Sequence, residues 1–181
     1  MLRRLVVVAA VLTSVAPASA LDLPARAPGL WELDVTPDLS GYNLPANLLP
    51  QRRATAHQCI DATVDQLFWR RDLGGPMVEQ KLCQANVSSR NGTVTADFVC
   101  SLRGLDMKMH MVISGDFEHA YTMDLTSSQG PINGVTLPPM HVTTAYKYVG
   151  PCEAGQRPGD FITPEGVMMH LFGDPKPPAK P

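Results

Sequence analysis

The chain has 181 residues, of which 44% are hydrophobic and 18% are charged, and its formal net charge is −2 at pH 7. This balance excludes the strongly basic surface by which proteins hold nucleic acid or anionic membranes. The length fits one domain with a modest core, and the four cysteines are an even number, as a set of disulfide bonds requires.

The first twenty residues have the three parts of a secretory signal peptide. Arg3 and Arg4 provide a basic start, residues 5–15 an apolar run, and an Ala-Ser-Ala cleavage site ends at Ala20. The apolar run is too short to span a bilayer, and a retained signal anchor is the alternative. We therefore expect residues 1–20 to be removed after Ala20, leaving an exported chain with no integral membrane segment.

The next part of the chain predicts two strands and a helix. Residues 30–35 alternate apolar and polar side chains, which indicates a half-buried strand. Residues 37–50 are rich in proline and are expected to form a loop, before a short strand that leads to Cys59. Asp61 is a suitable N-cap for a helix that Gly74-Gly75-Pro76 would end. Its predicted apolar stripe consists of Val64, Leu67 and Phe68.

A β-hairpin follows, and its turn fixes its register. Asn91-Gly92 is the pair that a type I′ turn requires, and with these residues as the loop, paired residue numbers sum to 183. Cys83 then lies opposite Cys100 in a non-hydrogen-bonded pair, where Cα atoms are about 4.5 Å apart, close enough for a disulfide. The remaining bridge would join Cys59 to Cys152, although the two other connectivities stay open.

A second hairpin is predicted between residues 105 and 125, around Ser114-Gly115-Asp116. A three-residue loop at Gly115 makes paired numbers sum to 230 and matches the apolar faces of the two arms. In this register His119 lies opposite Met111. A loop over 129–139 and a strand near 141–148 then bring the chain to Cys152.

Residues 153–181 are rich in proline and read as a tail outside the main core. Within this tail Thr163-Pro164-Glu165 predicts the start of a short helix. Its apolar stripe would be Val167, Met168, Leu171 and Phe172. Such a helix would either dock on the domain's own surface or serve as a hook for a partner.

Together these elements predict a mainly β fold. We expect a single antiparallel, curved, half-barrel-like sheet over residues 21–152, with one short helix after Cys59 and another in the tail. The two predicted disulfides place this domain in an oxidising compartment.

Four short motifs occur in an order that resembles a known family. They are Pro-Gly-Leu-Trp-Glu at 28–32, Cys-Ile-Asp at 59–61, the two hairpin cysteines, and Gly-Pro-Cys at 150–152. Their order is similar to that in the bacterial domain of unknown function family 3617, over about residues 28–152. The resemblance implies a small exported β-rich protein of a Gram-negative bacterium, without a known activity or catalytic residues. The loop 129–139 and the tail depart from this pattern.

No catalytic motif is present, and we expect a non-enzymatic protein without a cofactor. His57, His110 and His141 each lie in a predicted strand with no partner that the spacing enforces. We expect instead that one open end of the sheet binds an apolar small molecule or an envelope protein. The residues expected to form the walls of this site are Trp31, Phe98, Met109, Tyr121 and Tyr146.

A copper site is the alternative function. Met109 and Met111 share a strand face with Met107, and the register above adds His119 to them. Thioethers and an imidazole are soft ligands that suit Cu(I). The competing interpretation is that these methionines are adaptable core residues beside Phe117 and Tyr121.

Overall fold

The computed structural model describes residues 21–42, 53–132 and 134–173. The predicted signal peptide, part of the predicted loop at 43–52 and the end of the tail at 174–181 lie outside the described residues.

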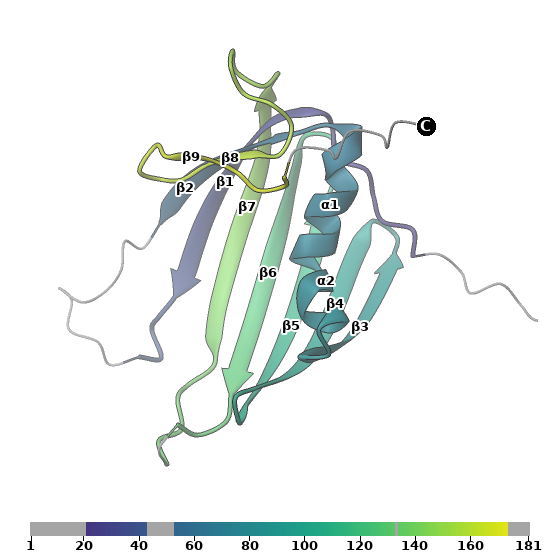
Figure 1. Cartoon of the computed structure of the whole chain (residues 1–181). Coiled ribbons are helices and arrows are strands. Elements are labelled where there is room, and N and C mark those ends of the chain that lie inside the picture. The colour runs from purple at the N-terminus through teal and green to yellow at the C-terminus, as the bar shows by residue number, and fades with distance from the viewer. Residues whose placement is uncertain (1–20, 43–52, 133, 174–181) are drawn as a thin grey trace, which may run out of the picture.

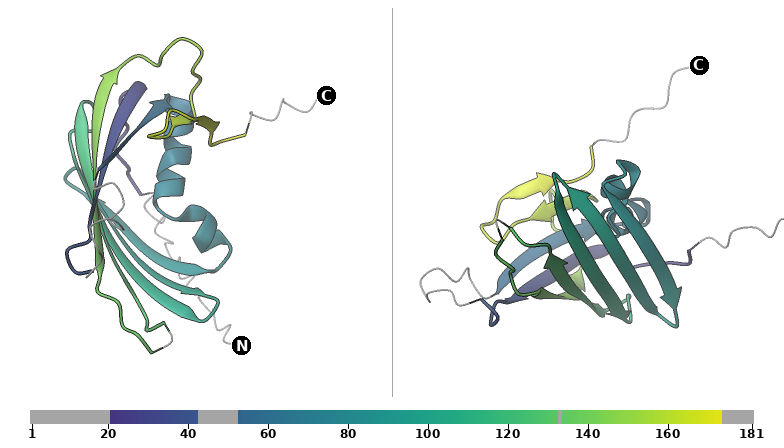
Figure 2. Two further views of the ribbon diagram at one scale, coloured as in Figure 1. Left: turned by 90° about the vertical axis from the view of Figure 1, so that its left-hand side faces the viewer. Right: turned by 90° about the horizontal axis from the view of Figure 1, so that it is seen from below.

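One antiparallel sheet of nine strands dominates the fold, which confirms the predicted fold class. Its spatial order is β3-β4-β5-β6-β7-β1-β2-β8-β9. The sheet is curved, and both helices lie on its concave side (Figures 1 and 2). The strands are β1 (Gly29–Asp38), β2 (Ala54–Ile60), β3 (Cys83–Arg90), β4 (Thr93–Leu102), β5 (Leu105–Gly115), β6 (Ala120–Gln129), β7 (Met140–Gly150), β8 (Asp160–Ile162) and β9 (Met168–His170). The helices are α1 (Ala62–Asp72) and α2 (Gly75–Glu79).

Helix α1 begins where predicted, but it turns a different face to the sheet. The Asp61 carboxylate accepts hydrogen bonds from the backbone N–H groups of Thr63 and Val64. Val64 and Phe68 are buried as expected, whereas Leu67 is 38% exposed. The buried stripe instead includes Asp65 and Trp69. Asp65 can be buried because it pairs with the guanidinium of Arg26, which lies under the helix.

A second helix, missed by the sequence analysis, follows the glycines that end α1. Gly74 has a φ of +69°, and a Cβ there would lie 3.0 Å from the Phe98 ring. A Cβ on Gly75 would lie 2.8 Å from the Arg70 carbonyl oxygen. The two glycines therefore allow the chain to turn sharply at the end of α1. Helix α2 begins at Gly75, and Pro76 lies in its first turn, where proline is well tolerated.

The first hairpin and both disulfides are confirmed. Cys83 pairs with Cys100, and every pair between β3 and β4 sums to 183. These two cysteines form a disulfide with their Cα atoms 4.0 Å apart. Cys59 and Cys152 form the other, which closes a sequence separation of 93 residues.

The predicted register of the second hairpin is wrong. Pairs between β5 and β6 sum to 236, so that Met111 lies opposite Leu125. The reason is a longer turn over residues 116–119, in which the Asp116 carboxylate accepts from the His119 N–H at 2.6 Å. Phe117 leaves the strand and enters the core, where it is 5% exposed. Both sums are even, so the faces stay as predicted while the arms slide along each other.

The tail is part of the sheet, and the predicted tail helix is wrong. Strand β8 pairs with β2, and β9 pairs with β8. Residues 163–166 form the turn between them, with the Gly166 N–H bonded to the Thr163 carbonyl and a φ of +81° at Gly166. Proline in the second turn position and glycine in the fourth close a hairpin, so the same letters that suggest a helix start here form a turn.

Strand β1 is longer than predicted. It continues to Asp38, and Pro37 pairs with Val142, so the loop expected from residue 37 begins later.

Among the described residues, none of the helices is long and apolar enough to cross a membrane.

Candidate functional site

The concave face of the sheet carries a ladder of aromatic rings beneath α1. Tyr121 stacks on Tyr146 with ring centroids 4.2 Å apart, and Trp31 lies 5.3 Å from Tyr121. Together with Phe98, these residues are at most 5% exposed. Four of the five residues predicted to bind a ligand therefore belong to the packed core. Met109, the fifth, is half-buried at the edge of that core.

Arg26 joins three parts of the molecule under the helix. Its Nε lies 2.5 Å from Oδ1 of Asp65 in α1, and its Nη1 donates to the Tyr121 hydroxyl at 3.0 Å. The guanidinium carbon lies 4.8 Å from the centre of the Trp69 ring, a cation–π distance. This group links the N-terminal segment, the helix and the sheet. The sequence does not indicate this role of Arg26, because a single arginine in a short irregular segment carries no sign of burial.

Burial and neighbouring charges shift the pKa values of Arg26 and of the two tyrosines beneath α1. Burial alone lowers the pKa of Arg26, but Tyr121, Asp72 and Asp65 outweigh that effect and hold the pKa above its ordinary value. Burial raises the pKa of Tyr121, which Asp72 and Asp65 raise further although Arg26 opposes them. Burial likewise raises the pKa of Tyr146. The guanidinium therefore stays charged and both phenols stay neutral at physiological pH.

A second region of the concave face is open. We call it the methionine face: a half-buried patch on β5, β6 and β7, formed by Met107, Met109, Leu125, Met140 and Val142. Cross-strand pairing holds it together, because Ser127 pairs with Met109 on one side and Met140 on the other. Among the described elements, α1 and α2 do not reach these strand ends, at the bottom of Figure 1.

A small hollow lies at the end of the methionine face. Its volume is about 120 Å³, and Met107, Met140 and Tyr42 contribute to its lining. The Tyr42 hydroxyl donates to the Pro138 carbonyl at 2.9 Å, which fixes the ring over the hollow. Ser127, Ser128 and Gln129 also line the hollow, and its volume is below the roughly 300 Å³ at which small-molecule sites usually begin. The apolar surface is therefore the patch itself, and the hollow is an indentation at its end.

The structure does not assemble the predicted copper ligands. Met109 and Met111 share a face, and Met111 is 7% exposed. His119 lies in the turn beyond the far end of β5, where its Nδ1 is 3.0 Å from the Asp116 carboxylate. Within the described residues, no group of three histidine, cysteine or acidic side chains is placed to hold a metal ion.

Comparison with known proteins gives one match. The family model described as "Protein of unknown function (DUF3617)" matches residues 26–152. No curated protein and no solved structure matches the chain. The matched region begins at the buried Arg26 and ends at Cys152 of the long-range disulfide, so it includes the methionine face and leaves out β8 and β9.

Proposed function

The chain belongs to the DUF3617 family of proteins of unknown function, and we propose that it is a non-enzymatic periplasmic protein that binds an apolar ligand on its methionine face. An envelope protein with an apolar contact segment is the alternative occupant of the same surface. The observation that carries the proposal is the half-buried patch of Met107, Met109 and their neighbours, beside a hollow on the concave side of the sheet.

The chemistry of the patch supports an apolar occupant. Removing apolar surface from water contributes about 25 cal/mol per Å², and this gain needs no specific polar group. Methionine side chains are flexible and polarisable, so they adapt to ligands of different shape. Three of the eight methionines in the described residues, Met107, Met109 and Met140, lie on this single patch. A linear acyl chain is the ligand class that an open strip of this kind fits best.

Two independent features, the N-terminal sequence and the disulfides, support export. The N-terminal twenty residues carry the pattern of a cleavable signal peptide. Two disulfides, one of them linking distant parts of the sheet, suit a protein that folds in an oxidising compartment. Periplasmic location follows from these two features as part of the proposal.

The experiment uses a fluorescent acyl probe, 11-(dansylamino)undecanoic acid. Replacing Met107 and Met109 together by glutamine keeps the length of each side chain and adds a polar amide. We expect the dissociation constant to rise about tenfold or more, which corresponds to about 1.4 kcal/mol. The matched control is Val99→Gln on the convex side, where Val99 is 55% exposed. Equal affinity of the double variant and the control would contradict the proposal.

A further inference from the structure

A cavity lies between the first turns of α1 and the tail hairpin, the segment 157–173 that contains β8 and β9. Its volume is about 440 Å³, within the range of about 300–1,000 Å³ that small-molecule sites occupy. The apolar part of its wall consists of Val64, Leu67, Pro158 and Phe172. We call it the tail cavity, and it is separate from the methionine face.

The walls of the tail cavity are held by the sheet. The Gly159 N–H donates to the Cys59 carbonyl at 2.9 Å, and the Leu171 N–H donates to the Gly159 carbonyl at 3.0 Å. The Phe172 ring meets the edge of the Phe68 ring with centroids 4.8 Å apart. Hydrogen bonds and ring packing therefore fix both sides of the cavity, which limits the cost of ordering it around a ligand.

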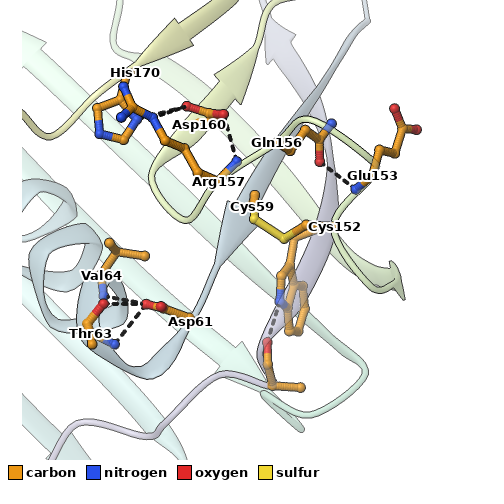
Figure 3. The surroundings of a disulfide bond; sticks show 12 residues. Cys59, Asp61, Thr63, Val64, Cys152, Glu153, Gln156, Arg157, Asp160 and His170 are labelled. Atoms are coloured by element: carbon orange, nitrogen blue, oxygen red, sulfur yellow. Dashed lines mark hydrogen bonds and ion pairs between the residues drawn. A yellow bond between two sulfur atoms is a disulfide. The ribbon is translucent and has the colours of Figure 1, made fainter. Parts of the chain in front are cut away.

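Most polar groups at the cavity already have partners. Figure 3 shows Asp61 and Thr63 at the start of α1, across from His170, Asp160 and Arg157 on the tail. The Asp61 carboxylate accepts from the backbone of Thr63 and Val64 and from the Thr63 hydroxyl. All three hydrogen bonds end on Oδ1 of Asp61, so this oxygen has little capacity left for a ligand.

His170 offers a nitrogen acceptor on the opposite wall. Its Nδ1 lies 2.8 Å from the Asp160 carboxylate, which also accepts from the Arg157 N–H at 2.9 Å. Because a carboxylate accepts, the proton of this hydrogen bond belongs to Nδ1, and in an uncharged imidazole with that tautomer Nε2 is an acceptor. Within the described part of the chain, Nε2 has no hydrogen-bond partner, although the His170 side chain lines the cavity and is 20% exposed.

Charges of both signs border the cavity. Arg157 is positive, whereas Asp61 and the carboxylate of Asp160 behind His170 are negative. A charged ligand would meet both signs here and would lose its hydration. The cavity thus combines an apolar wall with an acceptor nitrogen.

We propose that the tail cavity binds a small uncharged apolar molecule that carries one hydroxyl group, a phenol or an alcohol, whose O–H donates to Nε2 of His170. The apolar body of the ligand occupies the space against Leu67 and Phe172. This site goes beyond the proposed function, because it uses the tail hairpin and none of the methionine face.

The experiment compares three probes by isothermal titration calorimetry on the disulfide-bonded chain. 2-Naphthol carries the hydroxyl donor, 2-methoxynaphthalene has the same ring system without a donor, and 2-naphthoate adds a negative charge. We expect 2-naphthol to bind five- to tenfold more tightly than 2-methoxynaphthalene, the value of one hydrogen bond. Tighter binding of 2-naphthoate, or no binding of 2-naphthol, would overturn the proposal.

Variants locate the site. Leu67→Trp fills the cavity from a partly exposed position and should weaken 2-naphthol binding at least tenfold, whereas Gln66→Trp, on the exposed face of the same helix, should not. His170→Asn keeps a donor toward Asp160 but lacks Nε2, and it should remove only the preference for 2-naphthol.

Two controls complete the test. His110→Asn alters a similar histidine–aspartate pair, with Asp97, at an exposed strand position. This variant should leave the binding of 2-naphthol and its preference over 2-methoxynaphthalene unchanged. The Met107 and Met109 double variant should also bind 2-naphthol normally, which keeps this test separate from that of the proposed function. Unchanged binding in Leu67→Trp, or an equal loss in Gln66→Trp, would contradict the assignment of the site.

Discussion

Arg26 and Asp65 form a buried ion pair, with Nε of the arginine 2.5 Å from Oδ1 of the aspartate and both side chains at most 5% exposed. The pair connects the N-terminal segment to α1, and Tyr121 of the sheet accepts a further hydrogen bond from the same guanidinium. It therefore adds a polar link between the helix and the sheet to the packing of the core residues Val64, Phe68 and Trp69.

Loss of Arg26 should strongly destabilise the protein. Arg26→Met leaves Asp65 buried without its partner, and breaking a buried pair in this way costs about 3–5 kcal/mol. The control is Arg53→Met, because the side chain of Arg53 is 67% exposed where it pairs with Asp34, and solvent screens such a pair so that it contributes little to stability. Urea unfolding measures both. Similar losses in the two variants would show that the pair under α1 is not important for stability.

The two disulfides should contribute unequally. In the chain-entropy account, Cys59–Cys152, which closes 93 residues, contributes about 4–5 kcal/mol, and Cys83–Cys100, which closes 17, about 3 kcal/mol. Paired serine substitutions at each bridge, compared by urea unfolding, test this order. A free-thiol assay that finds Cys83 reduced in the exported protein would contradict the structural role of the hairpin bridge.

Gly29 should tolerate no side chain. Its φ is +142°, and a Cβ would lie 2.3 Å from the Gly150 carbonyl oxygen across the pair of β1 and β7. We expect Gly29→Ala to lower the free energy of unfolding by more than about 1 kcal/mol. Gly130→Ala is the control, since its nearest neighbour would be at an ordinary 3.6 Å, and a change below about 0.5 kcal/mol is expected. Equal losses of stability in Gly29→Ala and Gly130→Ala would contradict the prediction, because the backbone between β1 and β7 would then adjust to the added Cβ.

Asp160 should make stability depend on pH in the acidic range. Burial alone would raise its pKa, but hydrogen bonds from the Arg157 N–H and His170 hold the pKa below its ordinary 3.8. A lowered folded-state pKa stabilises the fold above pH 3.8 and loses that effect as the pH falls through the lowered value. The stability gap between wild type and Asp160→Asn should therefore shrink as the pH falls from 5 to 2. A constant gap in urea unfolding over this range would contradict the assigned hydrogen bonds.

How far the sequence determines the structure differs between the two main hairpins. Asn91-Gly92 permits one loop length, so the register of β3 and β4 follows from the turn. The alternation in β5 and β6 fixes which side chains share a face, but it repeats every two residues and allows the arms to slide. The longer turn combines the hydrogen bond from the His119 N–H to the Asp116 carboxylate with the packing of Phe117 into the core, and the alternation within the strands predicts neither contact.

The tail hairpin and the network around Arg26 also depend on contacts that local sequence patterns do not reveal. Thr163-Pro164-Glu165 is compatible with a helix start and with a turn, and the outcome depends on β2 offering a free edge to β8. The aromatic residues expected to form the walls of an open end are buried instead, and their burial depends on how α1 crosses the sheet. The burial of Arg26 depends on Asp65, 39 residues away. Such long-range pairings leave no periodic signal in one sequence.

The most direct test of the proposed function is methyl NMR of the protein with ¹³C-labelled methionine, titrated with 11-(dansylamino)undecanoic acid. We predict that the methyl resonances of Met107, Met109 and Met140 shift as the probe saturates, while those of the exposed Met168 and Met169 on β9 stay in place. Saturation of the probe with the three methionine-face resonances unchanged would contradict the assignment of ligand binding to this face.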